Sequence, residues 1–351
     1  MSSPRLRHLA LALLAGSLAA GTAGGEPSRG VSNGVSNGVL TGAANRAVAL
    51  VPSAPSFEVP AWAFPHQAPP AEPAADDKTV LHLEGSMQGF TRAQLADLFF
   101  TPDWFPGSHG PLPQVVAQGR KPDVNACGYC HTPRGQGRPE NASLAGLPAK
   151  YIRAQIADFR SGARRSAVPL GSVDRMIAVA QHASANDVAQ AAEYFSRQSL
   201  DRRVDVHEHP DAPRTRIVGY VYAPDPAGGI EPIGDRLLEV ASDIDRHELR
   251  DERIVYDAYV PPGTIARGRG IARQGAAPVP ACQGCHGPDL RGLGEAPPIA
   301  GRSPTYLLRQ LVAFRTGARA GAGAKPMKEV VAGLSLKDMV AVAAYAASLE
   351  P

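Results

Sequence analysis

The stretch ACGYCHTP at residues 126–133 places two cysteines and a histidine within five consecutive positions, and ACQGCHGP at residues 281–288 repeats the pattern. Such a Cys-x-x-Cys-His cluster can bind zinc, exchange disulfides or carry a covalently attached haem. The two clusters use all four cysteines of the chain. Their members are Cys127, Cys130 and His131 in the first, and Cys282, Cys285 and His286 in the second.

The sequence around each cluster is duplicated as well. LAGLPAKYIRAQIADFRSGAR (144–164) follows the first cluster and IAGRSPTYLLRQLVAFRTGAR (299–319) follows the second. Apolar residues at helical spacing predict an amphipathic helix in both stretches, ended by a glycine. A closing helix follows in each copy, where Ser184 and Ser335 are each followed three residues later by an aspartate, as in a capping box. The duplication therefore predicts a mainly α protein with two small helical domains in tandem.

The rest of the chain differs in composition from these two domains. Arg5 and Arg7 precede the apolar run HLALALLAGSLAAG, which is typical of a secretory signal peptide and shorter than a membrane-spanning helix. Between the copies, TRIVGYVYAP, DRLLEVA and DERIVYDAYVPPG have the β-branched and aromatic runs of strands. The predicted segments are a signal peptide (1–23), a flexible and disordered Gly/Pro/Ala-rich leader (24–78), domain 1 (79–199), a β-rich insert or strap (200–262) and domain 2 (263–351).

Three arguments separate the possible roles of the clusters. Zinc sites usually gather their ligands from short loops, whereas these clusters lie in two separate copies. Thiol–disulfide exchange uses a Cys-x-x-Cys at a strand–helix turn, which neither copy predicts. Covalent haem requires a histidine directly after the second cysteine, which both copies have. We therefore expect two haem c groups with iron, one per domain, with His131 and His286 as the proximal iron ligands.

The sixth ligand of each iron is expected to be a methionine. Met176 and Met327 each stand eight residues before the serine that begins the closing helix, in loops that are otherwise dissimilar. His182 competes with Met176 in the first copy but has no counterpart in the second. Met339 is expected in the core of the last helix. Thioether ligation favours a relatively high potential, and a filled sixth position favours electron transfer over catalysis.

Each half resembles a class I cytochrome c domain, and the pair resembles dihaem cytochromes of the c4 type. The resemblance rests on the haem motif, the Tyr-Gln-Phe-Gly-Arg helix, a methionine loop and the Ser-capped last helix, over about 112–199 and 263–350. It implies periplasmic electron transfer, and it implies that Tyr151, Gln155, Tyr306 and Gln310 lie near the haem edges or propionates. Such domains often use a proline carbonyl to orient the proximal histidine, and Ser143 replaces Pro298 in the first copy. The insert between the halves is not part of the c4 pattern.

A few other polar residues are candidate sites. His207 and His209 form a His-x-His that could bind copper or zinc, although a solvated loop is the simpler interpretation. His247 lies in a charge-rich segment and is expected at the surface. The arginines of DFRSGARRS and AFRTGARAGAGAK could pair with propionates, form a docking face or simply solvate a helix end.

The sequence favours a periplasmic dihaem electron carrier rather than an enzyme. Its partners would be redox proteins on the dehydrogenase or terminal oxidase/reductase side. Lys+Arg (36) and Asp+Glu (33) nearly balance, so nucleic acid is not an expected partner. One alternative is the haem subunit of a periplasmic dehydrogenase complex, docked through the 200–262 insert. A dihaem peroxidase is a further alternative, which would require a displaceable sixth ligand.

Overall fold

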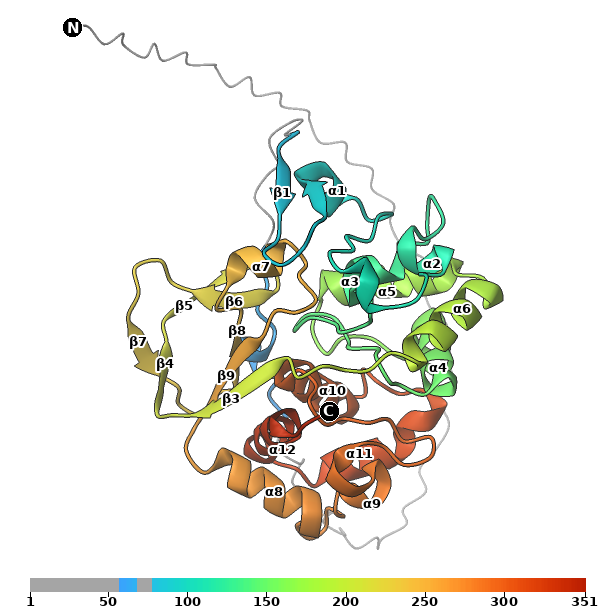
Figure 1. The fold of residues 1–351 in the computed structure, drawn as a ribbon. Coiled ribbons are helices and arrows are strands. Elements are labelled where there is room, and N and C mark those ends of the chain that lie inside the picture. The colour runs from blue at the N-terminus through green and yellow to red at the C-terminus, as the bar shows by residue number, and fades with distance from the viewer. Residues whose placement is uncertain (1–56, 68–77) are drawn as a thin grey trace, which may run out of the picture. The chain divides into compact units, whose positions relative to one another are not determined.

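The computed structural model describes residues 57–67 and 78–351 (Figure 1). The predicted signal peptide and the leader segments 24–56 and 68–77 lie outside the described residues. Within the described ranges, no single helix is long and apolar enough to cross a membrane, although Ala322–Ala332 and Leu336–Ser348, bent by 117° from each other, pass that test as a pair.

The first repeat contains the helices that its sequence predicts. The helix after the cluster ends at Gly162, whose φ of 73° is in the left-handed region that a glycine adopts without a steric cost. The closing helix begins after Ser184, whose hydroxyl accepts from the Asp187 backbone N–H while the Asp187 carboxylate accepts from the Ser184 N–H. The helices of this half are α2 (Gln114–Ala117), α3 (Cys127–His131), α4 (Ala149–Ser161), α5 (Gly171–His182) and α6 (Ala185–Ser196).

The second repeat follows the same plan. Its amphipathic helix ends at Gly317 with φ 77°, and Ser335 and Asp338 form the same reciprocal cap. Met339 is fully buried, as predicted for a core residue. The helices are α8 (Thr264–Gln274), α9 (Gln283–His286), α10 (Pro304–Thr316), α11 (Lys325–Ala332) and α12 (Leu336–Ser348), with short 3-10 helices at Pro288–Leu290 and Ala322–Ala324.

The two repeats differ in the connection that follows the amphipathic helix. Residues 163–170 join Gly162 to α5, whereas only 318–321 join Gly317 to the 3-10 helix before α11. Met176 and Met327 lie within the helices that follow these connections, in α5 and α11. The prediction that they lie in loops was therefore wrong, because the loop lies before each methionine rather than around it.

The region between the repeats is a small sheet. Its five strands have the order β3–β9–β8–β6–β5, in which β3 pairs in parallel with β9 and β8 pairs antiparallel with β9. The strands predicted from the three β-branched runs are confirmed as β5, β6, β8 and β9. The bounds are β3 (Val204–Glu208), β4 (Asp211–Pro213), β5 (Thr215–Val218), β6 (Val221–Pro224), β7 (Ile230–Pro232), β8 (Leu238–Val240), α7 (Ile244–Glu248) and β9 (Tyr256–Val260).

Two histidines of this region do not lie where the sequence suggested. His207 is in strand β3, paired with Tyr259, rather than in a solvated loop, because Val204 and Val206 alternate with polar residues as a half-buried strand requires. Its Nε2 atom lies 2.7 Å from the Asp257 carboxylate. His247 was expected at the surface and is only 6% exposed, since α7 packs it against the phenol of Tyr256, 3.0 Å from its Nδ1 atom.

A segment before the first repeat packs against the second repeat. The 3-10 helix Ala61–Ala63 lies in a core cluster with α10 and α12, and Arg309 of α10 donates to the Ala63 carbonyl at 2.6 Å. Residues 57–67 are thus ordered, and their assignment to a flexible leader was wrong, because Phe57, Trp62 and Phe64 bury apolar surface. The remaining elements are β1 (Val80–His82), β2 (Gly89–Thr91), α1 (Arg92–Ala96) and the 3-10 helix Pro106–Ser108.

Candidate cofactor site

Both cysteine–histidine clusters open onto one cavity. The cavity has a volume of about 1000 Å³, and residues of both repeats line it. Its lining includes all six cluster residues and also both candidate methionines: Cys127, Cys130, His131, Met176, Cys282, Cys285, His286 and Met327. The structure therefore brings together the residues that the sequence proposed as haem ligands, from four different helices and the turn at Cys282.

The two histidines are oriented by equivalent hydrogen bonds. His131 Nδ1 lies 2.7 Å from the Ala142 carbonyl, and His286 Nδ1 lies 2.8 Å from the Pro297 carbonyl. A carbonyl only accepts, so each Nδ1 carries the proton and each Nε2 keeps its lone pair for a metal. The accepting carbonyl belongs to the residue before Ser143 or Pro298. The serine in the first copy therefore leaves this hydrogen bond intact.

Burial keeps both imidazoles neutral. Burial lowers the pKa of His131, and the positive charge of the nearby Arg164 lowers it further. The hydrogen bond to the Ala142 carbonyl raises this pKa, but by less than burial lowers it. Burial likewise lowers the pKa of His286. A neutral imidazole is the form that binds iron, so the protein prepares both ligands before a metal arrives.

The cysteines are free thiols that are unsuited to disulfide exchange. No disulfide joins them, and burial raises the pKa of Cys127 to about 12. Burial also raises the pKa of Cys130 and of Cys282. Exchange cysteines have a lowered pKa, because the thiolate is the attacking species. Their electrostatic environment therefore argues against a thioredoxin-like role.

The competing sixth ligand lies away from the cavity. His182, at the end of α5, is exposed, and its Nδ1 atom lies 2.9 Å from the Ala178 carbonyl one turn earlier in the same helix. Met176, on the same helix, is half-buried and lines the cavity. Helix α5 therefore places Met176, and not His182, on the lining of the cavity.

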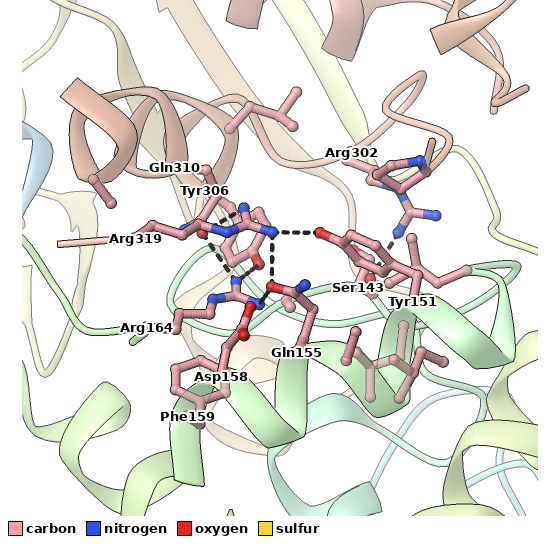
Figure 2. A pocket seen from close by; sticks show the side chains of 18 of the residues that line it. Ser143, Tyr151, Gln155, Asp158, Phe159, Arg164, Arg302, Tyr306, Gln310 and Arg319 are labelled. Atoms are coloured by element: carbon pink, nitrogen blue, oxygen red, sulfur yellow. Dashed lines mark hydrogen bonds between the residues drawn. The ribbon is translucent and has the colours of Figure 1, made fainter. Parts of the chain in front are cut away.

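Two arginines, one from each repeat, join the repeats beside the cavity, because each donates hydrogen bonds to side chains of the other repeat (Figure 2). Arg164 of the first repeat donates to Tyr306 (2.7 Å) and Gln310 (2.9 Å) of the second. Arg319 of the second donates to Tyr151 (2.6 Å) and Gln155 (2.8 Å) of the first. Both arginines are 7% exposed, so the interpretation of these positions as a solvated helix end was wrong.

Two further buried arginines, Arg302 and Arg309, line the cavity and were not identified from the sequence. Arg302 donates to the Ser143 and Ala145 carbonyls at 2.7 and 2.9 Å, and so ties the second repeat to the first. Burial lowers the pKa of Arg302 and of Arg309 to about 10. Arg164 and Arg319 could have been found from their matched positions in the duplication. Arg302 has no counterpart there, since Leu147 occupies the equivalent position.

The cavity has the donor set and the surroundings that a covalently bound haem needs. It offers two thiols, an imidazole and a thioether from each repeat. Three buried polar atoms on its lining, Glu140 Oε2, Ser172 Oγ and Arg309 Nη2, have no hydrogen-bond partner among the described residues. The unused donor of Arg309 suits a carboxylate of a porphyrin, and apolar walls suit its ring. The residues therefore fit haem c.

Comparison with known proteins agrees with this chemistry. The cytochrome c family model matches residues 265–350. Cytochrome c4 of Pseudomonas aeruginosa is 27% identical over 225 residues, which cover 62% of this chain and 81% of that protein. A thiosulfate dehydrogenase electron acceptor of Thiomonas intermedia is 28% identical over 203 residues, covering 57% of this chain and 67% of that protein.

Two more comparisons bear on individual regions. A solved thiosulfate dehydrogenase from Marichromatium purpuratum is 28% identical with a TM-score of 0.43; the match covers 64% of this chain and 37% of that chain. Cytochrome c-554(548) of Halomonas halodenitrificans is 39% identical over 82 residues, which are 23% of this chain and 99% of that protein. Nearly the whole of a small cytochrome is thus matched within this sequence. The chain belongs to the cytochrome c family.

Proposed function

We propose that this protein is a periplasmic dihaem cytochrome c that passes single electrons between redox partners. The observation that carries the proposal is the convergence of two complete donor sets, each with two thiols, an imidazole and a thioether, on one cavity. Cys127 and Cys130 would bind the first haem covalently, and Cys282 and Cys285 the second. His131 with Met176, and His286 with Met327, would be the axial ligands.

The residues of the chain would do three things for bound haem. The hydrogen bonds to Ala142 and Pro297 hold the imidazole rings in a fixed orientation, so ligation needs no rearrangement when the charge of the iron changes. The apolar walls exclude water, which limits solvent reorganisation. The buried guanidinium groups of Arg164, Arg302 and Arg319 would balance the negative charge of the propionates. When bound, each haem supplies an iron that alternates between the ferric and ferrous states by one electron.

The domain organisation belongs to the same proposal. We assign residues 79–199 and 263–351 to the two haem domains and 200–262 to an insert that braces them. The brace is supported by Glu239 of β8, which accepts from Ser303 Oγ (2.6 Å) and the Thr305 N–H (3.1 Å) at the start of α10. On its other side, Arg138 of the first repeat donates to the His247 carbonyl at 2.9 Å. Export to the periplasm follows from the predicted signal peptide.

A second candidate is the haem subunit of a periplasmic dehydrogenase. It is favoured by the similarity to a protein named as an electron acceptor of thiosulfate dehydrogenase. The iron chemistry would be the same in both cases, and the difference is whether a dehydrogenase stays bound. Size-exclusion chromatography of the protein from its native periplasm separates the two, since a carrier would elute alone and a subunit with its enzyme.

Spectroscopy of the purified holoprotein tests the haem assignment. The proposal expects two haems per chain, no reaction of the native protein with a thiol reagent, and a near-infrared methionine–iron(III) band. Met176→Ala and Met327→Ala should each remove about half of that band, and the double variant all of it. Met339→Leu is the matched control, since it changes a methionine of the core. A full-strength band in either alanine variant would contradict the assigned ligand.

A further inference from the structure

The turn that precedes the carbonyl orienting each cluster histidine has the same form in both repeats. With the repeats aligned on their clusters, Arg138 and Asn141 correspond to Leu293 and Ala296. The Arg138 N–H donates to the Asn141 carbonyl at 3.1 Å and the Asn141 N–H donates back at 2.9 Å, and the equivalent bonds of the second repeat are 3.3 and 3.1 Å long. Each turn ends one residue before the carbonyl that accepts from the histidine. Movement of the turn would therefore move this acceptor.

One anchor of this region is common to the two repeats. Arg302 donates through Nη1 to the Ser143 carbonyl and through Nε to the Pro298 carbonyl, both at 2.7 Å. Ser143 and Pro298 are equivalent positions, each directly after the residue whose carbonyl accepts from the histidine. The support behind the accepting carbonyl is therefore the same in both repeats, and the difference between them lies in the turn before it.

In the first repeat the insert holds this turn. The Arg138 side chain is 9% exposed, and its Nη1 atom lies 3.1 Å from Glu140 Oε1. Its Nη2 atom donates to two acceptors of one insert residue, the carbonyl of His247 at 2.9 Å and the Nε2 atom of the same residue. Arg309 adds a longer hydrogen bond, of 3.3 Å, to the Pro139 carbonyl. The turn is thus tied from outside its own repeat.

The equivalent turn of the second repeat is exposed. Leu293, at the position of Arg138, is 58% exposed, and residues 294 and 295 are exposed as well. Glu295 pairs with Lys150 of the first repeat, but these side chains are 75% and 77% exposed. An ion pair at the surface holds a chain only weakly, because water competes for both charges.

The bond between Arg138 and His247 fixes the state of the imidazole. A guanidinium only donates, so His247 Nε2 accepts and the proton lies on Nδ1, 3.0 Å from the Tyr256 hydroxyl. A second proton would place an N–H against the guanidinium, and burial together with the charges of nearby arginines lowers the pKa of His247. The insert therefore presents a neutral and oriented acceptor to Arg138.

We propose that His247 and Arg138 are positioning residues for electron transfer at the first haem, because through the turn 138–141 they hold the Ala142 carbonyl against His131. The inference rests on the proposed function. A hydrogen bond donated by Nδ1 raises the basicity of an imidazole ligand, and a more basic ligand favours ferric iron. The insert would thus keep this hydrogen bond intact in both oxidation states. The equivalent bond of His286 lacks that support.

Solvent exchange of the two Nδ1 protons tests the proposal in the unaltered holoprotein. The axial histidines give separate proton NMR signals, because each lies next to its own iron. The His131 proton should exchange for deuterium at least about tenfold more slowly than the His286 proton, since exchange requires the turn to open. Equal rates, or slower exchange at His286, would overturn the proposal.

Two neutral substitutions of His247 separate positioning from charge. His247→Leu leaves Arg138 Nη2 only the backbone carbonyl, whereas His247→Gln supplies an amide oxygen as a new acceptor. The leucine variant should exchange the His131 proton at least about threefold faster and raise the midpoint potential of the first haem by about 30 mV, a threefold change in the one-electron equilibrium. The glutamine variant should retain most of both wild-type values, and the second haem should be unchanged in each. Arg138→Lys keeps the charge but loses the planar fork, so it should act as His247→Leu does and gives the same test if the leucine variant does not fold.

Leu293→Ala is the matched control at the equivalent position of the second repeat. Its side chain is exposed, so exchange at His286 and both potentials should stay at their wild-type values. The proposal is wrong if His247→Leu and Arg138→Lys leave the first haem unchanged or shift both haems equally, as a general loss of stability would. It is also wrong if His247→Gln acts as strongly as His247→Leu, or if Leu293→Ala speeds exchange at His286 to the same degree. A protein without haem, or with iron not bound by these two histidines, would instead contradict the proposed function itself.

Discussion

Helix α8 contains two glycines that the structure predicts to respond in opposite ways to the same substitution. A Cβ at Gly268 would lie 2.0 Å from the Ala341 carbonyl oxygen and 2.7 Å from the Tyr345 Cβ, both on α12. A Cβ at Gly270, two residues later, would meet no atom within 4 Å. Gly268→Ala therefore forces the two helices apart, whereas Gly270→Ala only changes the helix propensity of an open position.

The sizes of the two effects follow from these distances. Reaching a contact distance of about 3.5 Å at Gly268 would require a shift of about 1.5 Å between backbones, which places the cost near the upper end of overpacking, about 3 kcal/mol. The gain from replacing a helical glycine by alanine is about 1 kcal/mol. We expect Gly268→Ala to lower the free energy of unfolding by about 2 kcal/mol and Gly270→Ala to raise it by about 1 kcal/mol.

Guanidinium unfolding of the holoprotein measures both effects. The half of the methionine–iron band assigned to Met327 would report the second repeat, where α8 packs against α12, and far-ultraviolet dichroism reports the helices. Equal stability of the two alanine variants would refute the close packing of α8 on α12. A Gly268→Ala protein as stable as wild type would show that α12 moves at little cost.

Two further predictions concern pH and helix capping. Burial and the charges of nearby arginines lower the pKa of His247 well below its usual value. Below about pH 6.5 the unfolded chain therefore binds a proton that the folded chain does not. The free energy of unfolding should fall as the pH drops through this range, by at most about 1.4 kcal/mol per pH unit. His247→Gln should flatten the pH dependence of urea-unfolding free energies measured from pH 7 to 5, and the same slope in the variant as in the wild type would exclude His247 as the cause. Ser335→Ala removes the acceptor for the Asp338 N–H and should lower the free energy of unfolding by about 1 kcal/mol, whereas Ser335→Thr should largely retain it in the same assay; an alanine variant as stable as the threonine variant would contradict the cap.

The insert acts mainly within the chain, as the contacts of its strands and of α7 indicate. Glu239 binds the start of α10, and the segment around Arg250 covers α3. Trp104, from the segment before the first repeat, donates to the Leu249 carbonyl at 2.7 Å and so holds this cover in place. These contacts cover α3, the helix that carries the first cluster, although the candidate haem ligands of the two repeats are equivalent in sequence.

Local sequence signals determined most of the helical fold and the candidate ligands. A glycine that ends a helix, a Ser–Asp cap and the helical spacing of apolar residues all depend on residues close together in the sequence. The helices α4, α6, α10 and α12 could therefore be predicted from the sequence alone. The cysteine–histidine clusters are local motifs too, and the duplication identified both methionines by their position relative to the caps. The loops expected around the methionines were misplaced, because the duplication gives register and not local conformation.

Tertiary structure decided which polar groups are buried. Arg164 and Arg319 donate hydrogen bonds to side chains of the opposite repeat, and His247 lies within hydrogen-bond distance of the Tyr256 hydroxyl in the insert. Nothing near these residues in the sequence distinguishes them from charged residues at the surface. Residues 57–67 are ordered by the second repeat, some 250 residues further on. The burial of Tyr129 depends likewise on the distant Arg250, because a side chain is covered only by what the folded chain brings to it.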